Sequence, residues 1–331
     1  MRIAINGFGR IGRIFLRSIL TKPGIEVVAI NDLSDTRTLA HLFKYDSVHH
    51  GFIGTVTFDD ENLYVNHHKI KIIAERDPEY LPWYQLDVDL VIESTGKFTA
   101  KQGAEKHLAA GAKQVIISAP STDKSVPTVV LGVNEDAVDL HSPILSNASC
   151  TTNNVAAMVK ILDDNWGIID GYITTIHSMT GDQSLHDTSH KDLRRARAAS
   201  ASIIPTTTGA AKAITSIFPH LDGKLGGAGI RVPVLNGSLT DFTCTLKIQP
   251  TVKEINLAFK NAAEGDMKNI LEYTEDPIVS SDIIGNTHSC VFDAQLTSIV
   301  GGLIKVVGWY DNEMGYSSRL ADLVEKIRLS K

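Results

Sequence analysis

The stretch that decides the fold is RIAINGFGRIG, residues 2–12. Residues 2–6 are typical of a short strand, and the residues that follow fit the pattern G-x-G-x-x-G at Gly7, Gly9 and Gly12. Residues 11–20 continue as a helix. Strand, glycine turn and helix in this order predict a dinucleotide site, because glycines let the backbone approach a pyrophosphate and the helix N-terminus stabilises its charge.

A second predicted strand, residues 25–30, is followed by Asn31 and Asp32. Asp32 lies twenty residues beyond Gly12. An acidic side chain at this spacing hydrogen-bonds both ribose hydroxyls of NAD. The cofactor predicted from these residues is therefore NAD.

The rest of the N-terminal half continues to alternate between helix and strand. We expect a helix from a cap at Ser34 to about Phe43, and then, further along, short strands over 55–74, a buried strand at 89–93, a helix at 100–110 and a strand at 114–118. This alternation predicts a parallel sheet whose ligand lies at the C-terminal ends of its strands. That topology places four side chains near the cofactor, although the first two are equally typical of plain strand ends: Glu93, Ser94, Thr95 and Ser118.

Size and composition exclude several classes of protein. A chain of 331 residues predicts two domains, and a net charge of -6 without a long basic tract predicts neither a nucleic-acid nor a membrane partner. Three cysteines suit neither a disulfide framework nor a metal site. Adjacent histidines cannot point the same way in an extended chain, so the histidine pairs are more typical of surface residues than of a metal site. With no N-terminal leader in the sequence given, we expect a cytoplasmic protein that binds no metal.

The stretch SNASCTTNN, residues 146–154, closes a polar turn and begins a helical run at 155–162. Cys150 is therefore expected in the first helical turn, where free N–H groups and the helix dipole favour an anion and lower the pKa of a thiol. A single cysteine is more often a small buried hydrophobe. Its polar neighbours, Ser149 and Thr151, favour a nucleophile instead.

A strand rich in β-branched residues, 171–176, leads to His177. An imidazole with a pKa near neutrality can take the proton of Cys150 and return it. The pairing is plausible rather than required, because the chain has 12 histidines and a histidine at a strand end is often structural.

A long loop at 178–204 is typical of a functional or interface segment, and it contains Thr180 and Arg194. The run PTTTGAAK at 205–212 begins a helix whose hydroxyls and free N–H groups suit a phosphate. Arg231 can donate two hydrogen bonds to the same anion. The alternative interpretation is an ordinary capped helix and a surface arginine.

The remainder of this half is more regular. A half-buried strand at 238–248 contains Cys244, most simply a structural residue, and Thr251 with Glu254 predicts a capping box before a helix to about 264. A core strand at 303–309 precedes an amphipathic helix at 316–329. We therefore expect an α/β enzyme with a dinucleotide-binding domain at 1–149 and a catalytic domain at 150–314.

Several segments resemble phosphorylating glyceraldehyde-3-phosphate dehydrogenases. They occur in that family's order and span essentially the full length: 6–13, 146–153, 192–199, 203–213, 231–233 and 309–313. The resemblance implies a doubly wound Rossmann sheet, an α+β catalytic domain with a largely antiparallel or mixed sheet, and a C-terminal helix, 315–331, that packs back onto the NAD-binding domain.

The resemblance also implies a homotetramer that converts glyceraldehyde 3-phosphate and inorganic phosphate with NAD, using Cys150 as nucleophile and His177 as base. NAD is expected at Gly7, Gly9, Arg10, Ile11, Gly12, Asp32, Arg76, Ser118 and Asn312, the last orienting the nicotinamide amide. The substrate phosphate is expected at Thr180 and Arg231. Inorganic phosphate is expected at Ser149, Thr151, Arg194, Thr208 and Gly209.

Two alternatives remain open at this stage. Erythrose-4-phosphate dehydrogenase shares the thiol chemistry, although the run at 206–212 favours the three-carbon substrate. A non-catalytic binding protein on the same fold belongs to a different class, and the presence of both Cys150 and His177 argues against it.

Overall fold

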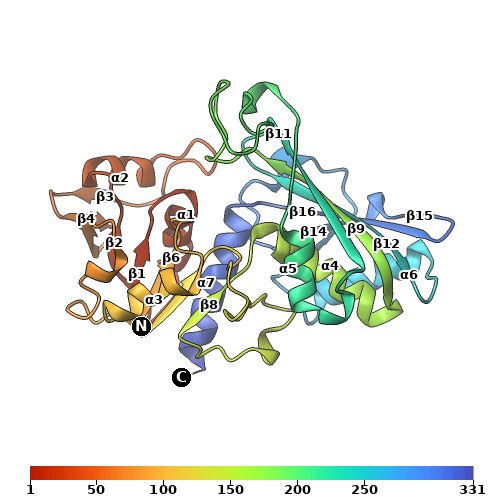
Figure 1. Ribbon diagram of the computed structural model, residues 1–331, viewed down its shortest axis with the longest axis horizontal. Coiled ribbons are helices and arrows are strands. Elements are labelled where there is room, and N and C mark those ends of the chain that lie inside the picture. Colours follow the sequence, from red (N-terminus) through yellow and green to blue (C-terminus); the bar gives the residue numbers. More distant parts are fainter. Residues whose placement is uncertain (331) are drawn as a thin grey trace. The chain divides into compact units, whose positions relative to one another are not determined.

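The computed structural model describes residues 1–330, so that Lys331, the last residue of the predicted C-terminal helix, lies outside the described residues. The chain divides into two units. Unit 1 comprises Met1–Val129, Glu135–Ala148 and the segment from Ser317, and unit 2 comprises Val130–Asn134 and Ser149–Tyr316. Each unit is built around an eight-stranded sheet, whose main strands are labelled in Figure 1.

The sheet of unit 1 has the strand order β3-β4-β5-β2-β1-β6-β7-β8. Neighbours from β5 to β8 in this order pair in parallel, and β3 and β4 add an antiparallel edge. The strands are β1 (Arg2–Asn6), β2 (Glu26–Asn31), β3 (Val56–Phe58), β4 (Asn62–Val65), β5 (His68–Ile73), β6 (Leu90–Glu93), β7 (Gln114–Ile117) and β8 (Ile144–Ser146). The predicted parallel sheet is confirmed, and β8 is an additional strand that we did not predict.

Four helices belong wholly or mainly to unit 1: α1 (Arg10–Ile19), α2 (Thr36–Lys44), α3 (Lys101–Ala109) and most of α7 (Met314–Leu329). The amphipathic α1 buries Ile14, Phe15 and Leu16. Beyond its end, Lys22 Nζ lies 2.9 Å from an Asp322 oxygen and 2.6 Å from a Glu325 oxygen. These ion pairs attach α7 to the segment that follows α1.

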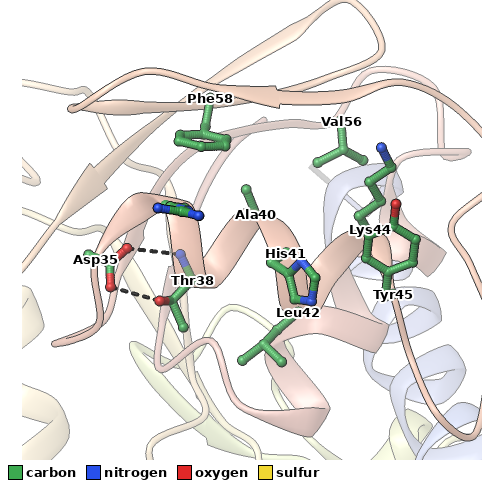
Figure 2. A pocket seen from close by; sticks show the side chains of 10 residues that line it. Asp35, Thr38, Ala40, His41, Leu42, Lys44, Tyr45, Val56 and Phe58 are labelled. Atoms are coloured by element: carbon green, nitrogen blue, oxygen red, sulfur yellow. Dashed lines mark hydrogen bonds between the residues drawn. The ribbon is translucent and has the colours of Figure 1, made fainter.

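The predicted cap of α2 is wrong by one residue. Asp35, rather than Ser34, accepts hydrogen bonds from Thr38 N at 2.9 Å and from Thr38 Oγ1 at 2.7 Å (Figure 2). Both residue types are good caps, so the sequence does not separate them. The folded backbone separates them, because Ser34 donates its own N–H to Asp32 Oδ1 at 3.0 Å and remains in the turn before the helix.

The sheet of unit 2 has the order β10-β11-β9-β12-β16-β14-β13, with β15 beside β16. Two pairs are parallel, β9 with β11 and β13 with β14, and the others are antiparallel, as expected for a mixed sheet. The strands are β9 (Ile168–Ser178), β10 (Ile204–Thr206), β11 (Leu225–Val232), β12 (Ser238–Leu246), β13 (Leu271–Thr274), β14 (Cys290–Asp293), β15 (Ser298–Val300) and β16 (Leu303–Tyr310).

The helices of unit 2 are α4 (Cys150–Trp166), α5 (Ala210–Ile217) and α6 (Val252–Glu264). Helix α4 is buried along most of its length and lies beside α5 against the sheet (Figure 1). The predicted capping box of α6 is confirmed, since Thr251 and Glu254 bond each other's backbone N–H groups. Within residues 1–330, no helix has the length and apolar character needed to cross a membrane.

Candidate active site

The glycine turn of unit 1 has the close packing that a dinucleotide loop requires. Gly7 has a φ of +94°, which favours glycine, and a Cβ on Gly12 would lie 2.3 Å from Gly7 O. A Cβ on Gly9 would meet no atom within 4 Å. The turn is therefore tightly packed beneath and open above, and α1 begins directly after it without a side-chain cap. The N–H groups of a first helical turn have no partner within the helix, so the start of a helix suits an anion.

A cleft of about 330 Å³ lies beside this turn. Asp32 lines it, and each of its carboxylate oxygens accepts one backbone N–H, from Phe8 at 2.9 Å and from Ser34 at 3.0 Å. A carboxylate has about four acceptor positions, so Asp32 retains capacity for ribose hydroxyls. The glycines, the helix N-terminus and this acid together fit the predicted NAD. The lining residues are Asn6, Gly7, Gly9, Asn31, Asp32, Leu33, Glu75, Arg76, Ser94, Thr95, Lys97 and Phe98.

The other predicted cofactor residues of unit 1 differ in their availability. Arg76 is exposed in the cleft. The guanidinium of Arg10 forms an ion pair with Asp46, and Arg10 and Ile11 are the first two residues of α1. Ser118 follows β7 and donates its hydroxyl hydrogen to Glu93 O at 3.0 Å.

Cys150 is the first residue of α4, which confirms its predicted place in the first helical turn. Ser149 caps the helix, with its Oγ 3.1 Å from Thr152 N and 2.8 Å from Thr152 Oγ1. Thr151 is buried, and its hydroxyl lies 2.8 Å from the hydroxyl of Tyr310. Ser149 and Thr151, both predicted to hold inorganic phosphate, therefore already form hydrogen bonds within unit 2.

The structure places His177 beside Cys150, with 3.5 Å between Sγ and Nε2. His177 is 8% exposed, and Tyr310 presents its ring to it in an edge-on arrangement. The parallel register of β9 and β11 puts Arg231 opposite His177. One strand pair thus brings an imidazole and a guanidinium together next to the thiol.

Two contacts of His177 Nδ1 exclude each other. Nδ1 lies 2.7 Å from Ser178 O, which only accepts, and 2.6 Å from Arg231 Nη1, which only donates. For Nε2 to accept the proton of Cys150, Nδ1 must carry a hydrogen and donate to Ser178 O. Arg231 then opposes Nδ1 as a second donor, which disfavours the charged imidazolium.

The pKa values of the pair differ from the sequence expectation for the thiol. Burial, followed by the charge of Arg231, lowers the pKa of His177 to about 4. Burial raises the pKa of Cys150, and Arg231 and the N–H of Thr151 only partly oppose that rise. Although some of the Cys150 surface is exposed, the thiolate is poorly solvated. The expected depressed thiol pKa is therefore wrong, and the pair is a thiol facing a neutral imidazole.

The anion residues of the long loop lie around Asp182 and Arg195. Arg195 Nη1 lies 2.7 Å from Asp182 Oδ2, and its Nε lies 3.0 Å from Thr206 Oγ1. Thr180 also donates its hydroxyl to Asp182. The predicted Arg194 is exposed, and only its backbone is bonded: its N–H donates to Asp192 Oδ1 and its carbonyl oxygen accepts from Arg197 N. The arginine that these contacts hold within the loop is therefore Arg195, and the sequence gives no signal that separates it from Arg194.

The remaining predicted residues also lie in unit 2. Thr208 and Gly209 precede α5, and a Cβ on Gly209 would meet no atom within 4 Å. Asn312 is buried, and its Oδ1 accepts hydrogen bonds from Ser178 Oγ at 2.8 Å and Ser238 Oγ at 2.9 Å. These two hydroxyls fix the orientation of the Asn312 amide.

Unit 1 also has a hollow that none of the predicted site residues line. It has a volume of about 690 Å³ and lies between α2 and β3, where Phe58, His41 and Tyr45 present their rings (Figure 2). Within residues 1–330, no group of three or more histidine, cysteine or acidic side chains could hold a metal ion.

Comparison with known proteins agrees with this geometry. The model of the glyceraldehyde 3-phosphate dehydrogenase NAD binding domain matches residues 1–101, and that of the family's C-terminal domain matches residues 149–312. The chain belongs to the glyceraldehyde-3-phosphate dehydrogenase family. This confirms the resemblance of its motifs, and it identifies NAD as the cofactor.

Full-length relatives have the same family name. Glyceraldehyde-3-phosphate dehydrogenase 2 of Streptomyces avermitilis is 54% identical over 326 residues, covering 98% of this chain and 97% of the relative. The glyceraldehyde-3-phosphate dehydrogenase of Geobacillus stearothermophilus is 53% identical over 329 residues, covering 99% and 98%. That of Mycobacterium tuberculosis is 53% identical over 335 residues, covering 98% and 97%.

The raised thiol pKa of Cys150 predicts how fast it is alkylated. With iodoacetamide, the rate should rise about tenfold per pH unit between pH 6 and 8, because only the thiolate reacts and its fraction grows tenfold per unit below the pKa. Mass spectrometry of the Cys150 peptide measures the rate. Cys244 and Cys290 are matched controls, since burial raises their pKa values and they should react slowly. A rate at Cys150 that is already constant from pH 6 would contradict the raised pKa.

Proposed function

We propose that this protein oxidises D-glyceraldehyde 3-phosphate to 1,3-bisphosphoglycerate with NAD and inorganic phosphate; its relatives are named glyceraldehyde-3-phosphate dehydrogenases. The observation that carries the proposal is the 3.5 Å contact between Cys150 Sγ and His177 Nε2, at the start of a helix and beside Arg231. A binding protein without catalysis has no need of this pair. The names of the relatives favour glyceraldehyde 3-phosphate over erythrose 4-phosphate.

Cys150 is the nucleophile and His177 the base. As Sγ attacks the aldehyde carbon, the thiol proton passes to Nε2, which is neutral at physiological pH because its pKa is lowered to about 4. The backbone N–H of Cys150, at the first position of α4, stabilises the oxygen of the hemithioacetal. His177 and this N–H thus act on opposite ends of the forming bond.

Arg231 links substrate binding to the strength of the base. Its charge lowers the pKa of His177, and its Nη1 crowds Nδ1 at 2.6 Å. The substrate phosphate, held by Thr180 and Arg231, neutralises this guanidinium and draws it toward the anion. Nδ1–H is then free to donate to Ser178 O, so His177 accepts the thiol proton most readily when substrate is bound.

The oxidation produces a thioester on Cys150. When bound, NAD would supply the hydride acceptor for this oxidation. Inorganic phosphate attacks the thioester and releases the acyl phosphate, and the departing Cys150 thiolate takes back its proton from His177 Nε2. A cysteine is required rather than a serine, because a thioester retains more of the oxidation energy than an oxygen ester does.

The cofactor residues divide between the two parts of the chain. We assign residues 1–149 to the NAD-binding domain and 150–314 to the catalytic domain, with the C-terminal helix belonging to the former. Gly7, Gly9 and Gly12 shape the pyrophosphate loop. The other NAD residues are Arg10, Ile11, Asp32, Arg76, Ser118 and Asn312, the last held with its amide N–H₂ free to meet the nicotinamide group.

Inorganic phosphate is held by backbone N–H groups, hydroxyls and one arginine. The residues are Ser149, Thr151, Thr208, Gly209 and, in place of Arg194, Arg195. Support for Arg195 comes from its contacts with Asp182 and Thr206, which hold the guanidinium within the loop. These contacts use two of its three side-chain nitrogens, and the third takes part in neither. Arg194 is exposed and has no comparable anchor.

We also propose a homotetramer that works in the cytoplasm. Support comes from large apolar side chains that remain exposed on the central strands of unit 2, namely Ile169 and Tyr172 on β9 and Leu303 on β16. Exposed apolar side chains that gather on one surface mark protein interfaces. Sedimentation of the purified protein measures the assembly state.

The function is tested by NADH formation from glyceraldehyde 3-phosphate, with phosphate present or omitted. We expect turnover that requires phosphate and falls below one hundredth in Cys150→Ser, because a hydroxyl is a far weaker nucleophile at neutral pH. NAD binding to this variant should be unchanged. Faster turnover of erythrose 4-phosphate, or ordinary activity in Cys150→Ser, would refute the proposal.

His177→Asn isolates the role of the base. The rate of thioester formation in single-turnover experiments should fall about a hundred- to ten-thousand-fold. Its pH profile should move to higher pH, because only thiol that is already ionised can attack. A profile that keeps its wild-type position would remove His177 from this role.

The two neighbouring arginines form a matched pair for the phosphate site. Arg195→Ala should raise the KM for inorganic phosphate about ten- to a hundredfold, the loss expected for a charged hydrogen bond of about 1.5–3 kcal/mol. Arg194→Ala should leave it within about twofold, since it removes the same charge from an exposed position. Steady-state kinetics at saturating aldehyde measure both, and equal effects would contradict the choice of Arg195.

A further inference from the structure

A buried network of hydrogen bonds lies beneath the glycine turn of unit 1, and no role assigned above uses it. Its centre is Glu93, the last residue of β6, whose side chain is 0% exposed. The carboxylate accepts from Asn6 Nδ2 at 2.6 Å and Thr95 N at 2.8 Å, and also from Thr95 Oγ1. His107 Nε2 lies 3.1 Å from the oxygen that Asn6 meets.

Trp83 fixes the state of His107. The indole Nε1 lies 3.0 Å from His107 Nδ1, and an indole N–H can only donate. Nδ1 must therefore accept and carry no hydrogen. The one hydrogen of the neutral ring is on Nε2, which donates to Glu93. His107 is accordingly a neutral donor and not an imidazolium.

The backbone fixes the other end of the network. Glu75 N donates to Asn31 Oδ1 at 2.9 Å, so Asn31 Nδ2 must donate to Asn6 Oδ1 at 2.7 Å. Asn6 then presents its Nδ2 to Glu93. The 3.4 Å approach of Asn6 Nδ2 to His107 Nε2 joins two donors, and both hydrogens are directed at the same carboxylate oxygen.

Both carboxyl oxygens of Glu93 are held by groups that donate, Asn6 and His107 at one oxygen and Thr95 N at the other. The Thr95 hydroxyl also meets the second oxygen, so a carboxylate at Glu93 satisfies all four contacts. Its neighbours include no cation, and a buried anion of this kind depends on keeping every donor. The network therefore ties the C-terminal ends of β1, β2 and β6 to one another through Asn6, Asn31 and Glu93.

The segment after Glu93 contacts the glycine turn directly. A Cβ on Gly7 would lie 2.7 Å from Thr95 N and 2.8 Å from Ser94 C, and Ser94 Oγ donates to Gly7 O at 2.7 Å. The position of Thr95 thus determines the position of Gly7. Glu93 determines that of Thr95 through two hydrogen bonds.

We propose that Glu93 is a positioning residue for the cofactor. Its carboxylate, held by Asn6 and by the His107 tautomer that Trp83 imposes, places Thr95 and with it the glycine turn that receives NAD. Glu93 itself is buried and acts only through these neighbours. The proposal rests on the NAD site proposed above.

Glu93→Gln tests this role, because glutamine has the same shape but directs an N–H₂ group at one pair of donors. We expect the Kd for NAD, measured by calorimetry on the apoprotein, to rise about tenfold. The kcat at saturating NAD and the alkylation rate of Cys150 should stay within about threefold. Leu63→Ala, a buried change on β4 of the same unit, is the control for lost stability and should leave the Kd within twofold.

A second variant tests the network directly. The double variant Asn6→Asp with Glu93→Gln moves the carboxylate to position 6. There it accepts hydrogen bonds from Asn31 and from the new amide at position 93. The Kd for NAD should therefore return at least threefold toward the wild-type value. Asn6→Asp alone opposes two carboxylates and should bind NAD no better than Glu93→Gln. Three results would overturn the proposal: a Kd within twofold in Glu93→Gln, an equal loss in Leu63→Ala, or no recovery in the double variant. Because calorimetry needs no turnover, an inactive wild type would refute the proposed reaction and not this role.

Discussion

The parallel pairing of β9 with β11 is the constraint on which the chemistry of unit 2 depends. Its register sets His177 opposite Arg231, while β12 pairs with the other edge of β9 and holds it in the middle of the sheet. Side chains alternate between faces along a strand, so a slip of one residue would turn the imidazole away from Cys150. The burial pattern of β12 resists that slip, because every second side chain is buried. Sheet packing therefore fixes a distance that the reaction needs.

Burial and charge act in opposite directions on the thiol and imidazole. Desolvation raises the pKa of Cys150 and lowers that of His177, so both groups are neutral before reaction. A charged pair created by proton transfer must be stabilised when it forms. Arg231 stabilises the thiolate but disfavours the imidazolium, so its charge acts in opposite directions on the two members of the pair.

The parts that sequence could predict depend on local signals. The glycine turn with its spaced Asp32, the capping box at Thr251 and the placement of Cys150 at the start of a helix are each determined within a few residues or a single structural unit. Strand β8 is only three residues long and pairs with β7 alone among the strands, so no periodicity reveals it. The strands β13 and β14 likewise depend on long-range pairing.

The site shows the same division. Residue types and spacing do not reveal which of Arg194 and Arg195 is held within the loop, because that depends on Asp182 and Thr206, which approach Arg195 only after folding. The thiol pKa was misjudged for a related reason. A helix N-terminus is visible in sequence, whereas the amount of protein around Cys150 is not, and desolvation is the larger effect.

Two buried histidines illustrate what separates a base from a support. His107 has one possible tautomer, because Trp83 only donates to one nitrogen and Glu93 accepts from the other. His177 has incompatible neighbours on Nδ1, an acceptor at Ser178 O and a donor at Arg231. A group that must gain and lose a proton needs surroundings that accommodate both states, whereas a group that holds an anion in place must not change. The hydrogen-bonding capacity of the neighbours, more than the imidazole itself, therefore decides which histidine can take part in catalysis.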